Sequence, residues 1–315
     1  MKDLAIGIDV GGTSIKGGAV TKEGKVLGYF KMPIDKTKTQ EETLNEMISI
    51  VNNYVKENNY KDRIIGIGAG IPGSIDRDSG RIIYCGNLGW KDMDFCKIMK
   101  EKTGFDTKII NDANAATYGE AKFGAGKNYP FSLLFTLGTG IGGGVIINGE
   151  LYEGNEGKGT EMGHLILEMN GRPCTCGRKG CWEKYASATA LIYDTKIAME
   201  KDPNSLLHKI AIEDGEVNGK TAFDAAKAGD LTANKVIDNY VMYLCEGLLT
   251  YCDIFRPNVI ILSGGIANQG DYLFDKVNAY LKKEHYGYPG TPKVDVIPAE
   301  LGYDSGKIGA AALFF

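Results

Sequence analysis

Asp9-Val-Gly-Gly-Thr-Ser-Ile-Lys16 contains a glycine pair between two short apolar runs, Leu4–Asp9 and Ile15–Val20. Apolar runs on both sides of such a pair predict two strands joined by a tight turn. Glycine in the turn lets backbone N–H groups approach a ligand closely, which is how many loops bind phosphate oxygens. These residues therefore predict a strand, a phosphate-binding turn and a second strand.

The same pattern recurs in the middle of the chain. Leu133-Leu-Phe-Thr-Leu137 is apolar, Gly138 to Gly144 is rich in glycine, and Val145-Ile-Ile147 resembles a strand. Hairpin-turn signals follow both copies, at Glu23-Gly24 and at Asn148-Gly149. The matching order indicates an internal duplication of a β-rich unit, although similarity this short also arises by coincidence.

A third glycine turn, Leu262-Ser-Gly-Gly-Ile266, follows the apolar run Val259–Leu262. One such turn would be weak support for phosphate binding, whereas three turns after three strands are much stronger support. Gly138-x-Gly-x-x-Gly143 also matches the dinucleotide-binding fingerprint. We reject that match because the next segment is a β-branched strand and not a helix.

Apolar residues at helical spacing predict helices over Leu44–Val55 and Val236–Cys252. Thr39-x-x-Glu42 is a possible capping box for the first helix, and Pro257 closes the second. A last helix over 305–315 is rich in small residues, which would let it pack closely against a sheet.

The composition bounds the class of protein. A chain of 315 residues with 43% hydrophobic and 24% charged residues predicts a globular protein of two domains. The formal net charge is −4 and no basic run is present, so we expect neither nucleic acid nor a membrane as a partner. The chain has no signal pattern and no apolar span, and its seven cysteines do not form a secreted disulfide framework. A cytoplasmic location is expected.

Asn111-Asp-Ala-Asn114 follows the apolar segment Lys108–Ile110 and precedes a predicted helix. Asn and Asp are typical helix N-caps, because their side chains accept hydrogen bonds from the first backbone N–H groups. A carboxylate at a strand end could also be a general base for a sugar hydroxyl. The motif alone favours the cap and leaves the base possible.

The strongest local signal is Glu161-Met-Gly-His164 followed by Cys174-Thr-Cys176-Gly-Arg-Lys-Gly-Cys181-Trp-Glu183. One histidine and three cysteines form a Cys₃His set that suits tetrahedral zinc. Cysteines also pack as small hydrophobic residues, but Arg178 and Lys179 between them indicate a surface loop. Four protein ligands would make the zinc structural. Its expected role is to brace polar side chains that could hold sugar hydroxyls: Glu161, His164 and Glu183.

Taken together, these motifs resemble the ROK family, a name that joins repressors, open-reading-frame proteins and sugar kinases. They occur in family order from the first strand to the last helix, and the cysteine motif is highly specific. Within the family the chain is most similar to bacterial glucokinases, through Asn87-Leu-Gly-Trp90 and Glu183-x-x-Ala-Ser-Ala-Thr189. The resemblance implies an α/β, actin-like ATPase fold, in which two ribonuclease-H-like domains related by duplication enclose a cleft.

The resemblance also implies domain limits and ligands. Residues 1–118 plus 300–315 would form the smaller domain, with the first phosphate turn, and 119–299 the larger one. Expected cofactors are ATP, Mg²⁺ and a structural Zn²⁺. A homo-oligomer is expected, with a dimer as the first choice.

Individual roles are implied for residues that match family positions. Asp112 would be the catalytic general base. The sugar would be bound by Asn87, Asn111, Asp112, Glu161, His164 and Glu183. Zinc would be held by His164, Cys174, Cys176 and Cys181. ATP and Mg²⁺ would be held by Asp9, Gly11, Gly12, Thr13 and Lys16, by Gly138 and Thr139, and by Gly264 and Gly265 near the adenosine.

The implied reaction is ATP-dependent phosphorylation of a hexose, with glucose and its 6-hydroxyl as the first choice. N-acetylmannosamine, N-acetylglucosamine and allose kinases resemble the chain at most of the same positions, and polyphosphate is an alternative donor in some relatives. A sugar-sensing repressor and an inactive zinc-braced scaffold are rivals from other classes. Repressor members carry a preceding helix-turn-helix domain, for which a first strand at Leu4 is expected to leave no room.

Overall fold

The computed structural model describes residues 2–86, 88–285 and 293–315, which divide into two compact units. The first unit comprises Met1–Pro130, Gly144–Thr160 and Glu300–Phe315, and the second comprises Phe131–Gly143 and Glu161–Ala299. The predicted domains divide the chain at 118/119, inside a continuous helix, and assign 144–160 to the other domain. The limits of the units differ from the predicted ones because Gly144–Thr160 packs with Met1–Pro130 in the first unit, although the two segments are separated in the sequence.

The first unit contains a mixed sheet of the order β3-β2-β1-β4-β8. β1 pairs antiparallel with β2 and parallel with β4, and β4 pairs parallel with β8. A smaller antiparallel sheet has the order β5-β6-β7. The strands are β1 (Leu4–Val10), β2 (Ser14–Thr21), β3 (Phe30–Pro33), β4 (Ile64–Ile71), β5 (Ser74–Asp76), β6 (Arg81–Cys85), β7 (Trp90–Met93) and β8 (Thr107–Asn111).

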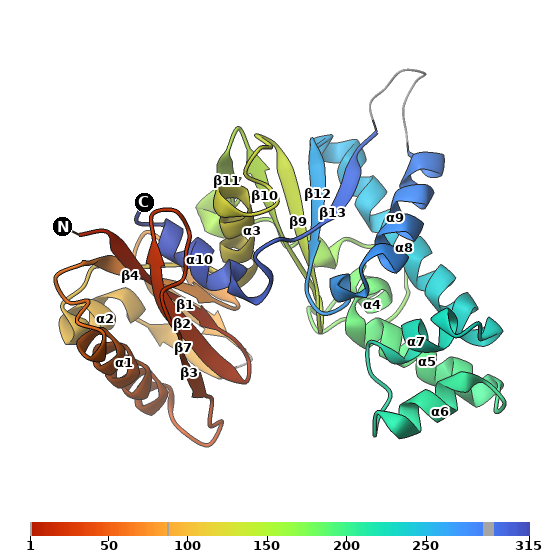
Figure 1. Ribbon diagram of the computed structural model, residues 1–315, viewed down its shortest axis with the longest axis horizontal. Coiled ribbons are helices and arrows are strands. Elements are labelled where there is room, and N and C mark those ends of the chain that lie inside the picture. Colours follow the sequence, from red (N-terminus) through yellow and green to blue (C-terminus); the bar gives the residue numbers. More distant parts are fainter. Residues whose placement is uncertain (1, 87, 286–292) are drawn as a thin grey trace. The chain divides into compact units, whose positions relative to one another are not determined.

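Helices cover both faces of the larger sheet (Figure 1). Alternate side chains of β1 point to opposite faces, so Leu4, Ile6 and Ile8 pack in the same core as α1, whereas Ala5 packs against α10. The predicted capping box of α1 is confirmed, because Thr39 and Glu42 each bond the other's backbone. The helices are α1 (Gln40–Glu57), α2 (Phe95–Thr103), α3 (Asp112–Phe123) and α10 (Ser305–Ala312).

Small residues allow α10 to lie close to β1 and to α3. A Cβ atom at Gly7 would lie 1.9 Å from the carbonyl oxygen of Lys307, and one at Gly309 would lie 1.7 Å from that of Ala115. The fully buried carboxylate of Glu120 accepts hydrogen bonds from the backbone N–H of Leu301, at 2.7 Å, and from two other amides. The expected close packing of the last helix on a sheet is therefore confirmed.

The second five-stranded sheet has the order β11-β10-β9-β12-β13, and β10 runs from the second unit into the first. Its order corresponds strand by strand to that of the first sheet, with an antiparallel hairpin at one edge and parallel pairs at the other. A duplication of a β-rich unit, as predicted from the sequence, would produce this strand-by-strand correspondence between the two sheets. The strands are β9 (Ser132–Leu137), β10 (Ile141–Ile147), β11 (Glu150–Tyr152), β12 (Val259–Ser263) and β13 (Asp295–Pro298).

Helices make up most of the rest of the second unit (Figure 1). The predicted long helix is present as α8 and ends two residues before Pro257. Its buried side chains follow the predicted spacing, from Val236 to Cys252. The helices are α4 (Glu183–Ala186), α5 (Ala188–Lys201), α6 (Leu206–Glu213), α7 (Thr221–Lys227), α8 (Leu231–Phe255) and α9 (Asp271–Glu284).

Candidate functional site

In the first unit, the turn between β1 and β2 carries the first predicted phosphate motif. The backbone N–H of Gly11 donates to the carbonyl oxygen of Ser14 at 3.0 Å, and the carbonyl oxygen of Thr13 accepts from Ile34 at 2.9 Å. Gly11 and Gly12 both lie in the described part of the chain, and neither of them has a left-handed φ. Glycine is therefore not required here by φ. Its remaining advantage is the lack of a Cβ, which leaves the turn backbone open to a close approach.

Asp9 lies at the end of β1 next to this turn, directly opposite Lys16 on β2. Burial raises the pKa of the Asp9 carboxyl, whereas the positive charges of Lys16 and Lys307 act in the opposite direction. A Cβ atom at Gly306 would lie 3.3 Å from Asp9 Cγ, so α10 begins against this carboxyl. A carboxylate beside a glycine turn is a suitable ligand for a Mg²⁺ ion that carries nucleotide phosphates.

Asn111 and Asp112 end β8 and begin α3. The Asn111 Oδ1 atom caps the helix, since it accepts hydrogen bonds from the backbone N–H groups of Ala113 at 3.0 Å and Asn114 at 3.2 Å. Asp112 is the first helical residue, and its Oδ1 atom accepts from Ala113 at 2.9 Å. The capping interpretation thus applies to Asn111. Asp112 lies in the first turn, where the helix dipole stabilises a carboxylate.

Asp9 and Asp112 both lie beside Gly70, near the end of β4. Asp9 pairs with Gly70 across the parallel β1–β4 ladder, and a Cβ atom at Gly70 would lie 3.6 Å from Asp112 Cα. The carboxyl ends of parallel strands meet at one edge of a sheet, which is where ligands bind in many α/β folds. The first unit therefore brings together two of the predicted site carboxylates.

In the second unit, the turns after β9 and β12 are neighbours. Gly264 has a φ of 92°, and a Cβ atom there would lie 2.6 Å from the carbonyl oxygen of Leu137. Both features require glycine. Within the turn after β9, Gly138 N–H donates to Gly140 at 3.1 Å, and the Gly138 carbonyl accepts from Ala188 at 2.8 Å. The exposed Thr139 lies between these two glycines.

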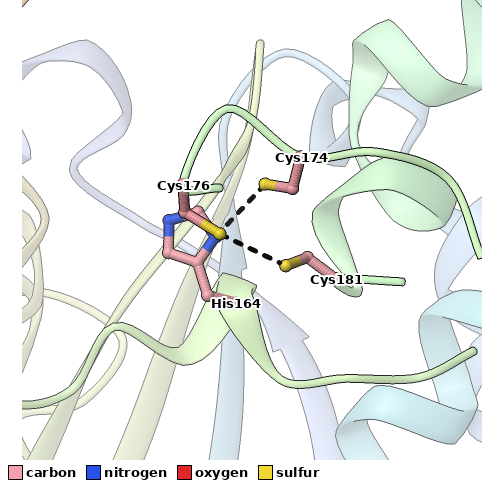
Figure 2. A group of neighbouring side chains, drawn as sticks. All are labelled: His164, Cys174, Cys176 and Cys181. Carbon is pink, nitrogen blue, oxygen red and sulfur yellow. Dashed lines mark hydrogen bonds between the residues drawn. The ribbon is translucent and has the colours of Figure 1, made fainter. Parts of the chain in front are cut away.

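The predicted zinc ligands converge in the second unit (Figure 2). The ring nitrogen or sulfur atoms of the four residues all lie within 4.8 Å of one another. Cys174 Sγ lies 3.6 Å from His164 Nδ1, and Cys176 Sγ lies 3.6 Å from Cys181 Sγ. Tetrahedral zinc, with Zn–S bonds of about 2.3 Å, needs sulfur atoms separated by distances of this kind. The cluster is compatible with a structural zinc site.

Local turns and one aromatic anchor shape this cluster. The backbone N–H of Cys174 donates to Arg178 at 2.9 Å, and Gly177 has a φ of 90° in the turn between them. Trp182, next to Cys181, is fully buried and donates from its indole N–H to the carbonyl oxygen of Tyr243 at 2.8 Å. Its ring meets Phe135 edge-on, with centroids 5.2 Å apart. The Cys loop is therefore anchored to the core of its unit.

The electrostatics of the three thiols differ. Burial raises the pKa of Cys181 to about 12 and also raises that of Cys174. For the exposed Cys176, a backbone hydrogen bond from Arg178 lowers the pKa. Zinc binds thiolates and favours their deprotonation, so metal binding at this cluster would release protons.

Glu183 connects the zinc cluster to the second glycine turn. Its Oε1 atom accepts a hydrogen bond from Cys174 Sγ at 3.1 Å, and a Cβ atom at Gly140 would lie 2.4 Å from its Oε2 atom. The side chain is 12% exposed. One carboxylate thus lies between a metal-type cluster and a turn predicted to bind phosphate.

Glu161 precedes a single turn of 3₁₀ helix, Met162–His164, and His164 is its last residue. Tyr251 donates from its hydroxyl to the Met162 carbonyl oxygen at 2.5 Å, and a Cβ atom at Gly163 would lie 2.0 Å from the Ile141 carbonyl oxygen. This turn is therefore held tightly against β10 and α8. Because Nδ1 of His164 faces the sulfur atoms, sugar binding by this residue would use Nε2.

Not every predicted site residue can be placed. Asn87 lies outside the described residues. Two residues without a predicted role, Asn114 and Glu153, contact each other beside the first turn of α3. Asn114 belongs to a quoted motif, whereas Glu153 belongs to none.

Similarity to known proteins identifies the family of the chain. A family model described as ROK family matches residues 5–315. The chain belongs to the ROK family. The glucokinase of Streptomyces coelicolor is 34% identical over 313 residues, which cover 98% of this chain and 97% of that protein. The xylose repressor of Bacillus subtilis is 30% identical over 311 residues, which cover 98% of this chain and 76% of the repressor.

A solved structure of a ROK family glucokinase from Streptomyces griseus, in complex with glucose and AMPPNP, has a similar fold. It is 31% identical to this ROK chain, the TM-score is 0.84, and 98% of each chain is covered. The predicted actin-like ATPase fold is confirmed by this likeness. Within the described residues, none of the helices combines the length and apolar character needed to cross a membrane.

Proposed function

We propose that this ROK protein is an ATP-dependent hexose kinase that converts glucose and ATP to glucose 6-phosphate and ADP. The assignment to sugar kinases is supported by the glucokinase-named relatives. The observation that carries the proposal is the position of Glu183, with one carboxylate oxygen at the zinc-type cluster and the other at the glycine turn after β9. A sugar bound by Glu183 would lie close to a turn suited to phosphate.

The proposed sugar ligands in the second unit are Glu161, Glu183 and His164 through Nε2. Zinc held by His164 and the three cysteines would act as a cross-link that fixes these side chains, with no part in the chemistry. Asp9 is the residue suited to hold Mg²⁺, which would supply charge neutralisation for the nucleotide phosphates. The three glycine turns would add backbone N–H donors to the phosphates and the adenosine.

Asp112 is the proposed general base. Phosphoryl transfer passes through a loose transition state, so positioning and charge matter more than covalent help from the protein. The Asp112 carboxylate would accept a hydrogen bond from the sugar 6-hydroxyl, orient its oxygen toward the γ-phosphorus and take its proton as the new O–P bond forms. Asn111 is held beside it by its capping bonds and would bind a neighbouring hydroxyl.

The match to a xylose repressor favours a second candidate, a sugar-binding regulator. Such a protein would bind a sugar without transferring phosphate. Within the kinase class, N-acetylmannosamine, N-acetylglucosamine and allose remain alternative substrates, since contacts at the sugar 2-position distinguish them. A cytoplasmic location and a homodimer are further parts of the proposal.

The test is sugar-dependent ADP release with magnesium-ATP and a panel of glucose, mannose, N-acetylglucosamine, N-acetylmannosamine, allose, xylose and fructose. We expect kcat/KM for glucose to exceed the others at least tenfold, about 1.4 kcal/mol in transition-state stabilisation. Another winner would change the substrate but keep the kinase assignment. Sugar binding without formation of a sugar phosphate, whether ATP or polyphosphate is supplied as donor, would favour the regulator instead.

A further inference from the structure

Three polar side chains meet beside the first turn of α3, all of them in the first unit. Asn114 Nδ2 donates a hydrogen bond to Glu153 Oε1 at 3.1 Å. The other carboxylate oxygen of Glu153, Oε2, forms an ion pair with Arg77 Nη1. Arg77 follows β5, and Glu153 follows β11. The Glu153 carboxylate therefore bridges a helix and a loop that are distant in sequence.

The bridge becomes more buried toward the helix. The side chain of Arg77 is 35% exposed and that of Glu153 is 11% exposed, whereas Asn114 is only 3% exposed. Loss of one partner would leave a largely buried charge or amide without its hydrogen bond, which is costly. The Asn114 Oδ1 atom accepts no hydrogen bond from any residue that the structure describes. Glu153 is therefore the side chain that orients the Asn114 amide.

Glu153 also closes a short loop. Its carbonyl oxygen accepts a hydrogen bond from the Gly159 N–H at 2.8 Å, and a Cβ atom at Gly154 would lie 2.8 Å from Gly159 Cα. The backbone thus closes on itself directly before Thr160 and Glu161. The side chain of Glu153 holds α3, while its backbone holds the segment that leads to a predicted sugar ligand.

We propose that Arg77, Asn114 and Glu153 are positioning residues for the phosphoryl transfer, because their bridge fixes the first turn of α3 and thereby the direction of the Asp112 carboxylate. This inference rests on the proposed kinase function. The first turn of a helix lacks the full set of backbone hydrogen bonds and frays easily. The Asn111 cap holds the start of this turn, and the bridge holds it at Asn114, two residues after the base.

The chemistry of the bridge depends on a carboxylate. Ionised Glu153 only accepts hydrogen bonds, so the Asn114 amide must turn Nδ2 toward it. A glutamine at 153 has nearly the same shape, but it can donate to Asn114 Oδ1 and so permits the reversed amide. It also lacks the charge that pairs with Arg77. Glu153→Gln therefore weakens the orientation while leaving the volume almost unchanged.

The experiment measures kcat, glucose KM and Tm for Glu153→Gln, Asn114→Ala and the double variant. Displacement of a catalytic group by about 1 Å costs about 100-fold, so we expect kcat to fall about 10- to 100-fold in each variant. Glucose KM should stay within about twofold, since none of the three bridge residues is itself a proposed sugar ligand. The double variant should lose no more than the worse single variant, because both changes break the same bridge.

Asp3→Asn is the matched control. It weakens another arginine–carboxylate pair of the first unit, Arg63 Nη2 to Asp3 Oδ2 at 2.6 Å, at the opposite end of β1 from Asp9. We expect unchanged kcat in this control. If Asn114→Ala does not fold, Arg77→Lys combined with Glu153→Gln measures the same coupling.

Unchanged kcat in Glu153→Gln, independent losses in the double variant, or a change confined to KM or Tm would overturn the positioning role. Wild-type protein without sugar-dependent ADP release would overturn the proposed function and this inference together. Normal wild-type turnover with unaffected variants would overturn the inference alone.

Discussion

Asn111 and Asp112 are neighbours whose side chains have different surroundings. Asn111 uses its side-chain oxygen to cap α3, and the carboxylate of Asp112 follows in the first turn. The capping bonds of Asn111 and the hydrogen bond to Asp112 Oδ1 therefore belong to different side chains. Single-residue changes can separate these two tasks.

Asp112→Asn is expected to fold normally, because Asn is well tolerated in a first helical turn and the cap is left in place. Without the carboxylate, no group accepts the sugar proton, so kcat should fall about 100- to 10,000-fold. Steady-state kinetics measure the loss, while calorimetric glucose binding and Tm provide the controls. Substantial kinase activity in this variant would exclude Asp112 as the base.

Asp9 predicts a pH dependence of stability. Burial raises the pKa of the Asp9 carboxyl above its ordinary value, so the ionised form is less favourable in the folded protein than in the unfolded one. This penalty is absent at a pH below the unfolded pKa, where both states are protonated, and it grows as the pH rises above that value. In protein freed of Mg²⁺, Asp9→Asn should raise Tm at pH 7 and raise it less near pH 4. An equal effect at both pH values would contradict the burial argument.

Thr160 lies in an unfavourable backbone conformation. Its φ is 60°. A β-branched residue in this left-handed region lowers the stability of the fold by about 1–2 kcal/mol. Glycine avoids this penalty but loses more entropy on folding, so Thr160→Gly should stabilise the protein by a net ~0.5–1 kcal/mol. Thr107→Gly in β8 is the control and should destabilise it. Denaturant midpoints of both variants provide the measurement, and a loss of stability in Thr160→Gly would refute the strain argument.

At the level of elements, the Cys loop is a small unit with its own turns and a buried tryptophan anchor. The exposure of Cys176 makes it informative, because an exposed cysteine contributes little to packing. A substitution of Cys176 can therefore measure the contribution of the bound metal to stability, separately from the packing of the core.

We expect Cys176→Ser to lower stability by at least about 1 kcal/mol, roughly 2–4 °C in Tm, and to weaken glucose binding, because zinc would lose one of four ligands. Melting curves and bound-zinc analysis measure these effects. After removal of metal by a chelator, wild type and Cys176→Ser should melt together. Equal melting temperatures before chelation would argue against a bracing metal, and Cys96→Ser serves as a cysteine control outside the cluster.

At the level of the whole molecule, sugar binding should stabilise the fold by mass action. Glucose at 100 times its Kd is expected to add about 2.7 kcal/mol to the free energy of unfolding, if only the folded protein binds it. Thermal melts against glucose concentration measure this effect, with L-glucose as the control ligand. A Tm insensitive to every sugar of the panel would contradict a sugar-binding protein of either class.

Local patterns in the sequence were sufficient to predict much of this fold. β1, β9 and β12 are apolar runs that end at glycine turns, and the four zinc-type ligands lie close together along the chain. The bridge of Arg77, Asn114 and Glu153 could not be predicted from the sequence. Asn114 and Glu153 are 39 residues apart, and no periodic pattern in the sequence indicates that their side chains meet. The limits of the two compact units also differ from the predicted domains, since they depend on packing between distant segments.

The close packing of α10 has a consequence for the order of synthesis. A ribosome makes β1 and β4 first and α10 only after the whole second unit. Gly7 and Gly68 therefore lack their contacts with α10 while more than half of the chain is synthesised. The second unit is able to complete its core before the unit that begins the chain. A protease pulse on stalled nascent chains would therefore find protection in the later-made unit first.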